Sequence, residues 1–455
     1  FKTAIMSPSP EFESRITFPD LVLDDYQVKS INLDSLLVGG DDFEIGTAPM
    51  DMVKVELVED TGDDWGRNLV IRHNELKNKW IDTTGNISYA QGCAVMEGYI
   101  PVTPNEVLTF TKTYLEGGYW RWRWFDAEMN YIARTVDGRN EFQWIVPENT
   151  YYIQVSYPMD AFPKIERGNK ATDWTPAPED YVNYDYKNKE CDIELGLTLP
   201  DESVEYVSIG KFTVENAVRK NNTITLDCVD RMYKAEKDYV SDLMYPTTIL
   251  DILESACDQA GIELATTTFA NSGYIVPNEP VYEGVTCRKV FAQVAELAGG
   301  YAKINNLGQL EIITLGSESV RDITKDHYFD LKINEVAEAS IDKVIVKVGE
   351  ETATKGDGEN IYTIVDNMFV QNPANVVDAL YNVLKNVSYT ACTLKWQGDF
   401  SLDLGDKVTV DGNDTYVLSR KLTYTGGLKE DYSAPAKSNI EKQSTGKGSL
   451  TLEMA

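Results

Sequence analysis

The chain has 455 residues, of which 42% are hydrophobic, 25% charged and 11% aromatic, a composition typical of a folded protein with about two to four domains. Its 42 basic and 73 acidic side chains give a formal net charge of −31, which repels phosphate backbones and argues against a DNA- or RNA-binding role. The six cysteines follow no CxxC spacing, so we expect free thiols rather than a disulfide framework. No apolar run approaches the roughly 20 residues of a membrane span, so no membrane anchor is expected.

The chain begins with a β-rich segment. Apolar and polar residues alternate in "RITF", "LVLDDYQVKSINLD" and "MVKVELVE". The same alternation occurs after residue 181 in "KECDIELGLTL", "EYVSIGKFTVENAVRK" and "NTITLDCVD". Each segment alone makes about half a barrel. We therefore predict one discontinuous β-barrel from 1–65 and 178–235.

Residues 66–177 differ in composition from both flanks. Seven of the chain's 8 tryptophans lie in this segment or at its edge, and its ends, "EDTGDDWG" and "TPAPED", have the composition of linkers. We interpret the segment as a separate β-sandwich inserted into a loop of the barrel.

Helical spacing first appears after residue 236. Apolar residues recur at helical intervals in "YPTTILDILESACDQAGI" and "TCRKVFAQVAELAGG", which stop at Gly261 and at Gly299, and a hairpin through Gly308 follows. These features predict a small α+β domain over 236–325. Strands resume in 326–455, interrupted by one helix in "NPANVVDALYNVLKNV" with Asn372 as its cap and Pro373 in its first turn, and we predict a second β-barrel there. The expected fold class is mainly β with a small α+β part.

Residue patterns for catalysis or metal binding are missing. The two histidines, His73 and His327, lie in different predicted domains without a nucleophile motif beside them, and the HxE form of "HNE" lacks the PCxxC partner of a zinc deaminase. The acidic groups in "KGDGEN" and "VDGNDTY", which are Asp357, Glu359, Asp411, Asn413 and Asp414, complete no calcium ligand set and are interpreted as turns. We expect no catalytic residue, no metal and no cofactor. A glycosidase needs only two carboxylates, and the sequence alone does not identify such a pair.

The stretch "GGYWRWRWFDAEMNYIA" raises the main question about function. In a strand, Trp120, Trp122 and Trp124 point to one face while the residues between them point to the other. Either the rings fill a sandwich core or they form a platform that stacks on sugar rings. We expect the tryptophans in the core and a glycan-contacting face on the opposite side, formed by Tyr119, Arg121, Arg123 and Asp126, with Trp144 or Tyr157 from neighbouring strands.

The insert as a whole resembles a known kind of module. Its segments "GRNLVIRHN", "GYIPVTPNEVLTF", "RWFDAEMNYIAR", "VPENTYYIQVSYP" and "KIERGNKATDWTPAPED" look like successive strands and the tail of the carbohydrate-binding jelly-roll modules in tail and receptor-binding proteins of phages of Gram-positive bacteria. The resemblance implies a β-sandwich that binds a glycan of the host cell surface.

The flanking chain resembles phage baseplate hub proteins, the family that includes the N-terminal part of siphophage tail-associated lysins. The motifs occur in that family's order, beginning with "YVSIGKFTVENAVRKNNTITLDCVDRMYKAEKDY" and ending with "LGDKVTVDGNDTYVLSRKLTYTGGL". The resemblance implies a homotrimeric ring at the virion tail tip that continues the tail tube and contacts the tube or distal tail protein and other baseplate components. DNA would pass through this ring without specific binding, and the acidic charge suits that passage.

The sequence therefore predicts a structural, non-enzymatic baseplate hub with an inserted carbohydrate-binding domain. Two alternatives remain open. The first is a tail-associated cell-wall hydrolase whose catalytic part is cryptic or lies beyond residue 455. The second is a free, secreted glycan-binding protein of bacterial origin.

Overall fold

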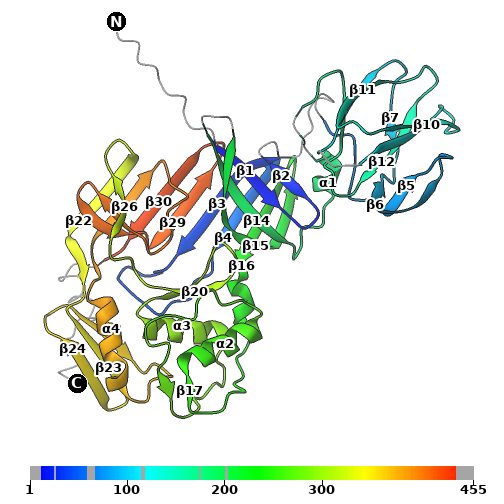
Figure 1. Cartoon of the computed structure of the whole chain (residues 1–455). Helices are drawn as coiled ribbons and strands as arrows, with labels where there is room; N and C mark the ends of the chain where they lie inside the picture. The colour runs from blue at the N-terminus through cyan, green and yellow to red at the C-terminus, as the bar shows by residue number, and fades with distance from the viewer. Residues whose placement is uncertain are drawn as a thin grey trace, which may run out of the picture.

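The computed structural model describes residues 12–24, 27–58, 67–113, 118–172, 174, 176–199 and 203–436. The protein is mainly β with a few short helices, as expected (Figure 1). Within these ranges no helix combines the length and the apolar character that a membrane span requires.

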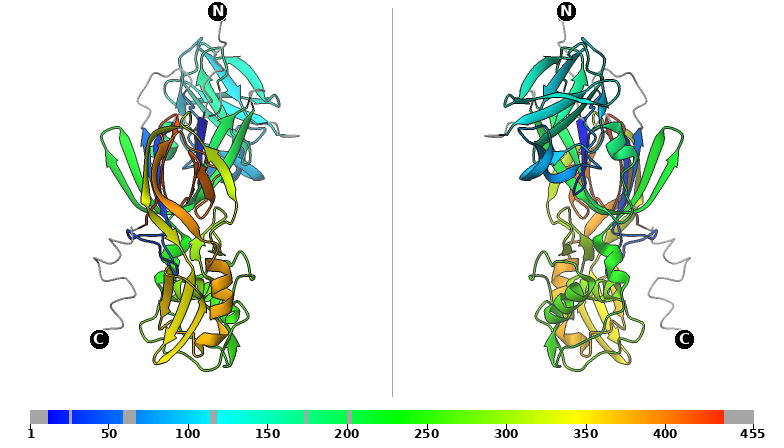
Figure 2. Two further views of the ribbon diagram at one scale, coloured as in Figure 1. Left: turned by 90° about the vertical axis from the view of Figure 1, so that its left-hand side faces the viewer. Right: turned by 90° about the vertical axis from the view of Figure 1, so that its right-hand side faces the viewer.

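The largest element is an 11-stranded sheet that curls around an apolar interior (Figure 2). Its strands are, in spatial order, β2 (Val22–Asp24), β1 (Phe12–Thr17), β14 (Glu190–Thr198), β15 (Val204–Lys220), β16 (Thr223–Asp230), β4 (Met52–Val58), β3 (Val28–Leu36), β29 (Ser419–Tyr424), β30 (Leu428–Ala434), β26 (Ser388–Trp396) and β22 (Tyr328–Ser340). The expected alternation is present, because β4 buries Val53, Val55 and Leu57 and exposes the residues between them.

This sheet joins the two segments that the sequence analysis assigned to separate barrels. Strand β3, near the N-terminus, pairs in antiparallel register with β29, near the C-terminus, from Leu36 opposite Ser419 to Ile31 opposite Tyr424. Leu422 and Tyr424 of β29 belong to the same buried cluster as Ile31 and Leu33 of β3. The N-terminal and C-terminal strands therefore form one hydrogen-bonded sheet with a shared core.

Below the sheet lies an α+β part that is larger than the expected 236–325 (Figure 1). The helices α2 (Ile249–Ala260), α3 (Cys287–Ala298) and α4 (Val377–Leu384) share one buried cluster with residues of the short strands. The short strands of this part are β17 (Thr247–Thr248), β18 (Ile275–Val276), β19 (Tyr301–Ile304), β20 (Leu310–Ile313), β21 (Ser319–Ile323), β23 (Lys343–Val348), β24 (Glu351–Gly356), β25 (Ile361–Val365), β27 (Lys407–Val410) and β28 (Asn413–Tyr416), and all except β17 contribute to this cluster or pack against it.

Local signals explain where the helices begin and end. Thr248 caps α2 through a reciprocal capping box with Asp251, and Gly261 ends the helix in the left-handed conformation, φ 67°. Helix α3 has Thr286 as its cap and ends at Gly299, φ 73°. The expected stops at both glycines are confirmed. The third helix begins later than expected, because Asn372 caps a 3-10 turn, Pro373–Asn375, and α4 starts only at Val377.

The insert forms a β-sandwich of two sheets. The larger has the order β10 (Tyr131–Asp137), β9 (Trp120–Phe125), β12 (Tyr152–Pro158), β6 (Ile87–Val95) and β5 (Leu76–Ile81), with β7 (Ile100–Pro101) also paired to β12. The smaller consists of β11 (Glu141–Ile145), β8 (Val107–Thr111) and β13 (Lys164–Arg167). We call this unit the sandwich (67–172), and the rest, 12–58 and 183–436, the scaffold. The two meet at α1 (Pro178–Val182), and β10 lies at the side of the sandwich away from the scaffold (Figure 1).

Candidate functional site

The three tryptophans of β9 face the interior of the sandwich. Trp120 and Trp122 are 0% and 1% exposed, and Trp124 is half-buried at the edge of the same cluster. Phe110 of β8 packs between them, with ring centroids 5.3 Å from Trp120 and 4.9 Å from Trp122. The expectation that these rings form the core is confirmed, because large rings at alternate positions fill the space between the two sheets.

The arginine face of β9 is covered by another part of the sandwich. Arg121 donates to the carbonyl of Ile81 at 3.3 Å, Arg123 to that of Gly85 at 2.7 Å, and Arg134 of β10 to that of Thr83 at 2.9 Å. All three acceptors belong to the β5–β6 hairpin, Ile81 as the last residue of β5 and Thr83 and Gly85 in the turn. The guanidinium of Arg121 also stacks on the ring of Trp80, 3.4 Å from its centroid. Both β9 arginines are only half exposed, so the expectation of free contact groups is not met.

The hairpin that covers this face has a well-ordered turn. The Asp82 carboxylate accepts hydrogen bonds from the N–H groups of Thr84 and Asn86 and from the hydroxyls of Thr84 and Ser88. These bonds, first of all those from Ser88 and Thr84, stabilise the charged form and lower the pKa of Asp82 well below its usual range. The sequence "DTTGN" signals a turn, but nothing in it shows that the turn folds over a neighbouring strand.

The remaining predicted site residues do not gather in one place. Tyr119 is 51% exposed at the start of β9 and packs against Gly138. Asp126 closes the turn after β9 by accepting from the N–H groups of Glu128 and Asn130, and the Asn130 side chain lowers its pKa. These two residues lie at opposite ends of the strand.

Trp144 and Tyr157 belong to the interior. The Trp144 ring lies 5.7 Å from that of Trp122 and 5.6 Å from that of Trp124. Tyr157 is 1% exposed and donates to Glu75 at 3.0 Å, and burial raises its pKa well above the usual value. In the structure both side chains stabilise the sandwich core.

The outer face of the smaller sheet is covered by the tail motif "ERGNKATDW". Glu166 is buried and accepts from the N–H and hydroxyl of Thr172, while the ammonium of the buried Lys164 donates to the same hydroxyl at 2.6 Å. Trp174 donates from its indole N–H to the carbonyl of Pro163. These contacts hold the segment 168–172 against the sheet, so this part of the chain has a structural role.

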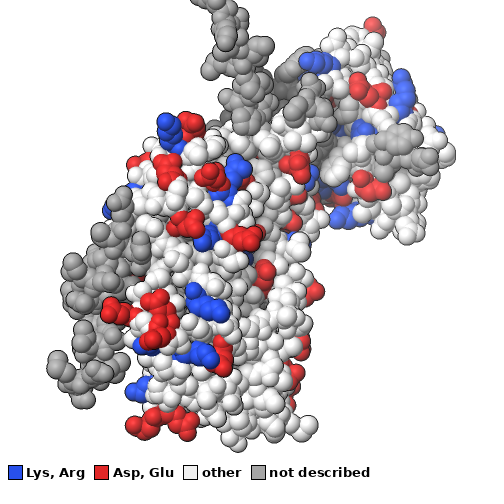
Figure 3. Space-filling model, turned by 60° about the vertical axis from the view of Figure 1, so that its left-hand side comes forward, with Lys and Arg blue, Asp and Glu red and all other residues white. Residues whose placement is uncertain are grey.

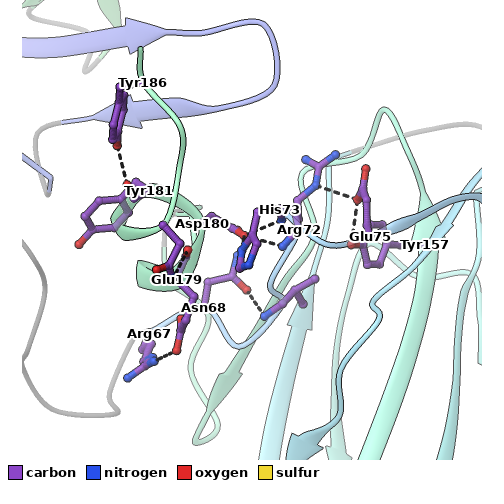
Figure 4. Close-up of polar contacts among 12 residues, drawn as sticks. Arg67, Asn68, Arg72, His73, Glu75, Tyr157, Glu179, Asp180, Tyr181 and Tyr186 are labelled. Carbon is purple, nitrogen blue, oxygen red and sulfur yellow. Dashed lines mark hydrogen bonds and ion pairs between the residues drawn. The ribbon is translucent and has the colours of Figure 1, made fainter. Parts of the chain in front are cut away.

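The connection between sandwich and scaffold is a compact set of polar contacts around α1 (Figure 4). On the sandwich side, Asp180 accepts from the backbone N–H groups of Arg72 at 2.6 Å and His73 at 2.9 Å, and Glu179 pairs with Arg67. On the scaffold side, Tyr181 is fully buried and donates to the carbonyl of Val58, the last residue of β4. The helix therefore contacts both units at the point where the chain leaves and re-enters the scaffold.

Groups typical of catalysis or metal binding do not converge among the described residues. In that part of the chain no group of three or more His, Cys, Asp or Glu side chains has the geometry of a metal site. His73 contacts Asp180 at 3.2 Å, and His327 contacts Thr324, so each histidine has a local structural partner.

Comparisons with known proteins found similarity to solved structures only. No protein-family model matches the chain, and no curated protein matches its sequence. A solved structure of a tail protein from Neisseria meningitidis MC58 is similar at 9% identity, with a TM-score of 0.45 over 93% of this chain and 96% of that one. A 43 kDa tail protein of prophage MuSo2 from Shewanella oneidensis is similar at 10% identity, with a TM-score of 0.44 over the same shares. Both of these solved structures are tail proteins, one of them from a prophage.

Proposed function

We propose that the protein is a structural baseplate hub of a phage or phage-like tail, in which the scaffold forms a homotrimeric ring at the tail tip and the sandwich binds a glycan of the host cell surface. The scaffold would continue the tail tube, contact the tube or distal tail protein and other baseplate components, and let DNA pass without specific binding. The order of hub-like motifs along the chain supports the ring, and the resemblance of the insert to glycan-binding modules supports the attachment role.

One structural observation supports the assignment of the ring to the scaffold and of glycan binding to the sandwich. The sandwich is inserted between β4 and β14, yet β4, β16, β15 and β14 remain neighbours in one uninterrupted sheet. Strand β4 pairs with β16 along its whole length, up to Val58, the last described residue before the insert, which lies opposite Thr223. The scaffold therefore needs no strand from the sandwich, which suits an appended binding module on a structural ring.

The surface charge suits an assembly component of this kind. On the face shown in Figure 3, acidic and basic side chains are interspersed over the scaffold, and only a region toward its lower right carries few of either. A face that mixes both signs favours contact with other proteins, and the net negative charge of the chain disfavours contact with a polyanion.

Solution mass and imaging test the ring. Light scattering on the full chain is expected to report a trimer, or a mass that rises toward one with concentration, and electron microscopy a threefold ring. A strictly monomeric protein that also fails to join tube or baseplate proteins would contradict the proposal.

Purified cell walls test the hydrolase alternative, because loss of turbidity or release of sugars on incubation would favour an enzyme.

A further inference from the structure

Three aromatic side chains form a row across the outer face of the larger sandwich sheet. The strand register places Tyr131 of β10 opposite Phe125 of β9, and Phe125 opposite Tyr152 of β12. Phe125 has the same parity as Arg121 and Arg123, so it faces away from the tryptophan core. Tyr99, just before β7, packs edge-on against Phe125 with ring centroids 5.1 Å apart, and Tyr131 lies 6.2 Å from it. We call Tyr131, Phe125 and Tyr152, together with Tyr99, the aromatic row.

The aromatic row lies at the part of this face that the β5–β6 hairpin leaves accessible. Phe125 is 6% exposed, whereas Tyr99 and Tyr131 are 39% and 47% exposed, so a buried ring supports two accessible ones. The next rows along the strands are Arg134, Arg123 and Gln154, and then Val136, Arg121 and Ser156. Gln154 and Ser156 of these later rows are buried beneath the hairpin, whereas Val136, on the edge strand β10, is 45% exposed.

The tip of the hairpin places polar groups beside these rings. A Cβ atom on Gly85 would lie 2.5 Å from the Tyr131 hydroxyl oxygen, so the turn is in direct contact with the row. Thr83, Thr84 and Asn86 are exposed at this tip. Arg123 stands 5.3 Å from the Phe125 ring and is held by two hydrogen bonds to the Gln154 amide oxygen. Ring faces bordered by hydroxyl and amide groups are the surface that an amphipathic sugar ring recognises.

The charge of the sandwich agrees with a carbohydrate ligand. Residues 66–177 contain 12 basic and 13 acidic side chains, so this segment is nearly neutral although the whole chain carries −31. The scaffold carries −25 of the total of −31. A nearly neutral module neither attracts nor repels an uncharged polymer, so binding rests on stacking and hydrogen bonds.

We propose that the aromatic row is the sugar-contacting site of the sandwich, with Tyr131 and Tyr99 stacking on neutral pyranose rings of a cell-surface polysaccharide and the 82–86 turn supplying hydrogen bonds. This inference rests on the proposed glycan-binding role. Neighbouring strands are about 4.8 Å apart, so the three-strand row spans about 10 Å, wide enough for a short run of sugar rings. The expected site ran along β9 from Tyr119 to Asp126, and this assignment centres it on Phe125, near the Asp126 end of the strand.

The test compares tyrosines of similar exposure at the two ends of β9. Binding of the full chain is measured on two immobilised probes, a neutral cell-wall polysaccharide and a phosphate-bearing wall teichoic acid, both from Gram-positive bacteria. Tyr131→Ala and Tyr99→Ala are expected to weaken binding to the neutral polysaccharide by about tenfold. Tyr131→Phe, which keeps the ring, and Tyr119→Ala, the matched control, are expected to bind like the parent, with unfolding temperatures unchanged.

Each other outcome contradicts a stated part of the inference. Normal binding by Tyr131→Ala and Tyr99→Ala with weakened binding by Tyr119→Ala would overturn the site and leave the glycan-binding role intact. Binding to teichoic acid alone would overturn the neutral-sugar class. A parent chain that binds neither probe would overturn the glycan-binding role together with the site. If Tyr131→Ala fails to fold, the Tyr99→Ala result decides, because Tyr99 lies outside the paired strands.

Discussion

Asp180 accepts a hydrogen bond at 2.9 Å from the backbone N–H of His73, which stands 107 residues earlier in the chain. The same carboxylate oxygen accepts from the N–H of Arg72 at 2.6 Å (Figure 4). Asp180 lies on α1, beside Tyr181 in the scaffold core, whereas Arg72 and His73 lie at the start of the sandwich. Burial raises the pKa of Asp180, because removal from water disfavours the charged carboxylate. The hydrogen bonds from the two backbone N–H groups offset part of this desolvation cost.

Replacing Asp180 with Ala is expected to loosen the attachment of the sandwich. The change leaves two backbone N–H groups without their acceptor at a buried site, which costs about 1 to 3 kcal/mol each where water does not replace the bond. Limited proteolysis near α1 should accelerate, and small-angle scattering should show a broader range of particle dimensions. Glu179→Ala is the control, because it removes only the partly exposed pair with Arg67 and should cost about 1 kcal/mol or less. Equal behaviour of the two variants would refute the role given to Asp180.

Trp122→Ala is expected to destabilise the sandwich by about 3 to 5 kcal/mol, because it removes a ring that is 1% exposed and packed against Phe110 and Phe142. Scanning calorimetry of the full chain should show the sandwich transition at lower temperature and the scaffold transition unchanged. Trp124→Ala, at a half-buried position of the same strand, should cost less. A parent-like transition for Trp122→Ala would be incompatible with a core role.

Arg123→Ala is expected to free the hairpin that lies over β9. It removes the donor to the Gly85 carbonyl and the two bonds to Gln154, at an expected cost of about 1 to 3 kcal/mol for charged donors. Amide hydrogen exchange in the 82–86 turn should become faster while exchange in β11 and β8 stays unchanged. Arg139→Ala provides the comparison, since Arg139 is largely exposed and pairs with Asp137. Unchanged exchange in the turn would show that the hairpin is held without Arg123.

Two neighbouring aspartates of the scaffold predict a pH dependence. The Asp51 N–H donates to the Asp230 carboxylate at 3.0 Å, and the Asp230 N–H donates to the Asp51 carbonyl at 3.0 Å. Burial raises the pKa of Asp51 to about 6, and burial together with the Asp51 charge raises the pKa of Asp230 to about 8, from 3.8 in each case. The folded state therefore holds protons that the unfolded state has released.

The direction in which the free energy of unfolding changes with pH follows from that difference in bound protons. The stabilising contribution is complete below pH 3.8 and is lost as the pH rises through the folded-state pKa values, so the free energy of unfolding should fall between about pH 4 and pH 8. Asp51→Asn removes one titrating group and the charge beside Asp230, so the fall should become shallower, by about 3 kcal/mol across this range. Urea unfolding at several pH values measures it. An equal or steeper fall in the variant would contradict the assignment.

Deleting 66–177 and joining the ends through a short Gly/Ser loop is expected to leave a folded scaffold with the oligomeric state of the parent. The paired strands β4 and β16 and the buried Tyr181 are all retained, and loop closure adds little cost at this length. Circular dichroism and light scattering compare the two proteins. Insolubility, or loss of the oligomer, would show that the sandwich is part of the scaffold's stability.

Features set by short-range order were predictable from the sequence. The period-two pattern of "WRWRW" places its tryptophans on one face, and three such rings can be buried only between two sheets, as the structure shows for Trp120 and Trp122. The ends of α2 and α3 follow from Thr248, Thr286 and the two left-handed glycines, because capping bonds and a positive φ depend only on neighbouring residues.

Features that join distant segments were decided by the tertiary structure. The pairing of Leu36 with Ser419 joins the two predicted barrels in one sheet. The alternating pattern of a strand does not specify its partner, because many strands of the chain share that pattern. The hairpin over Arg121 and Arg123 and the Tyr131–Phe125–Tyr152 row depend likewise on which strands become neighbours. Alternation determines which side of a strand is apolar, but the neighbour of that strand, and whatever covers its polar side, depend on contacts between residues far apart in the chain.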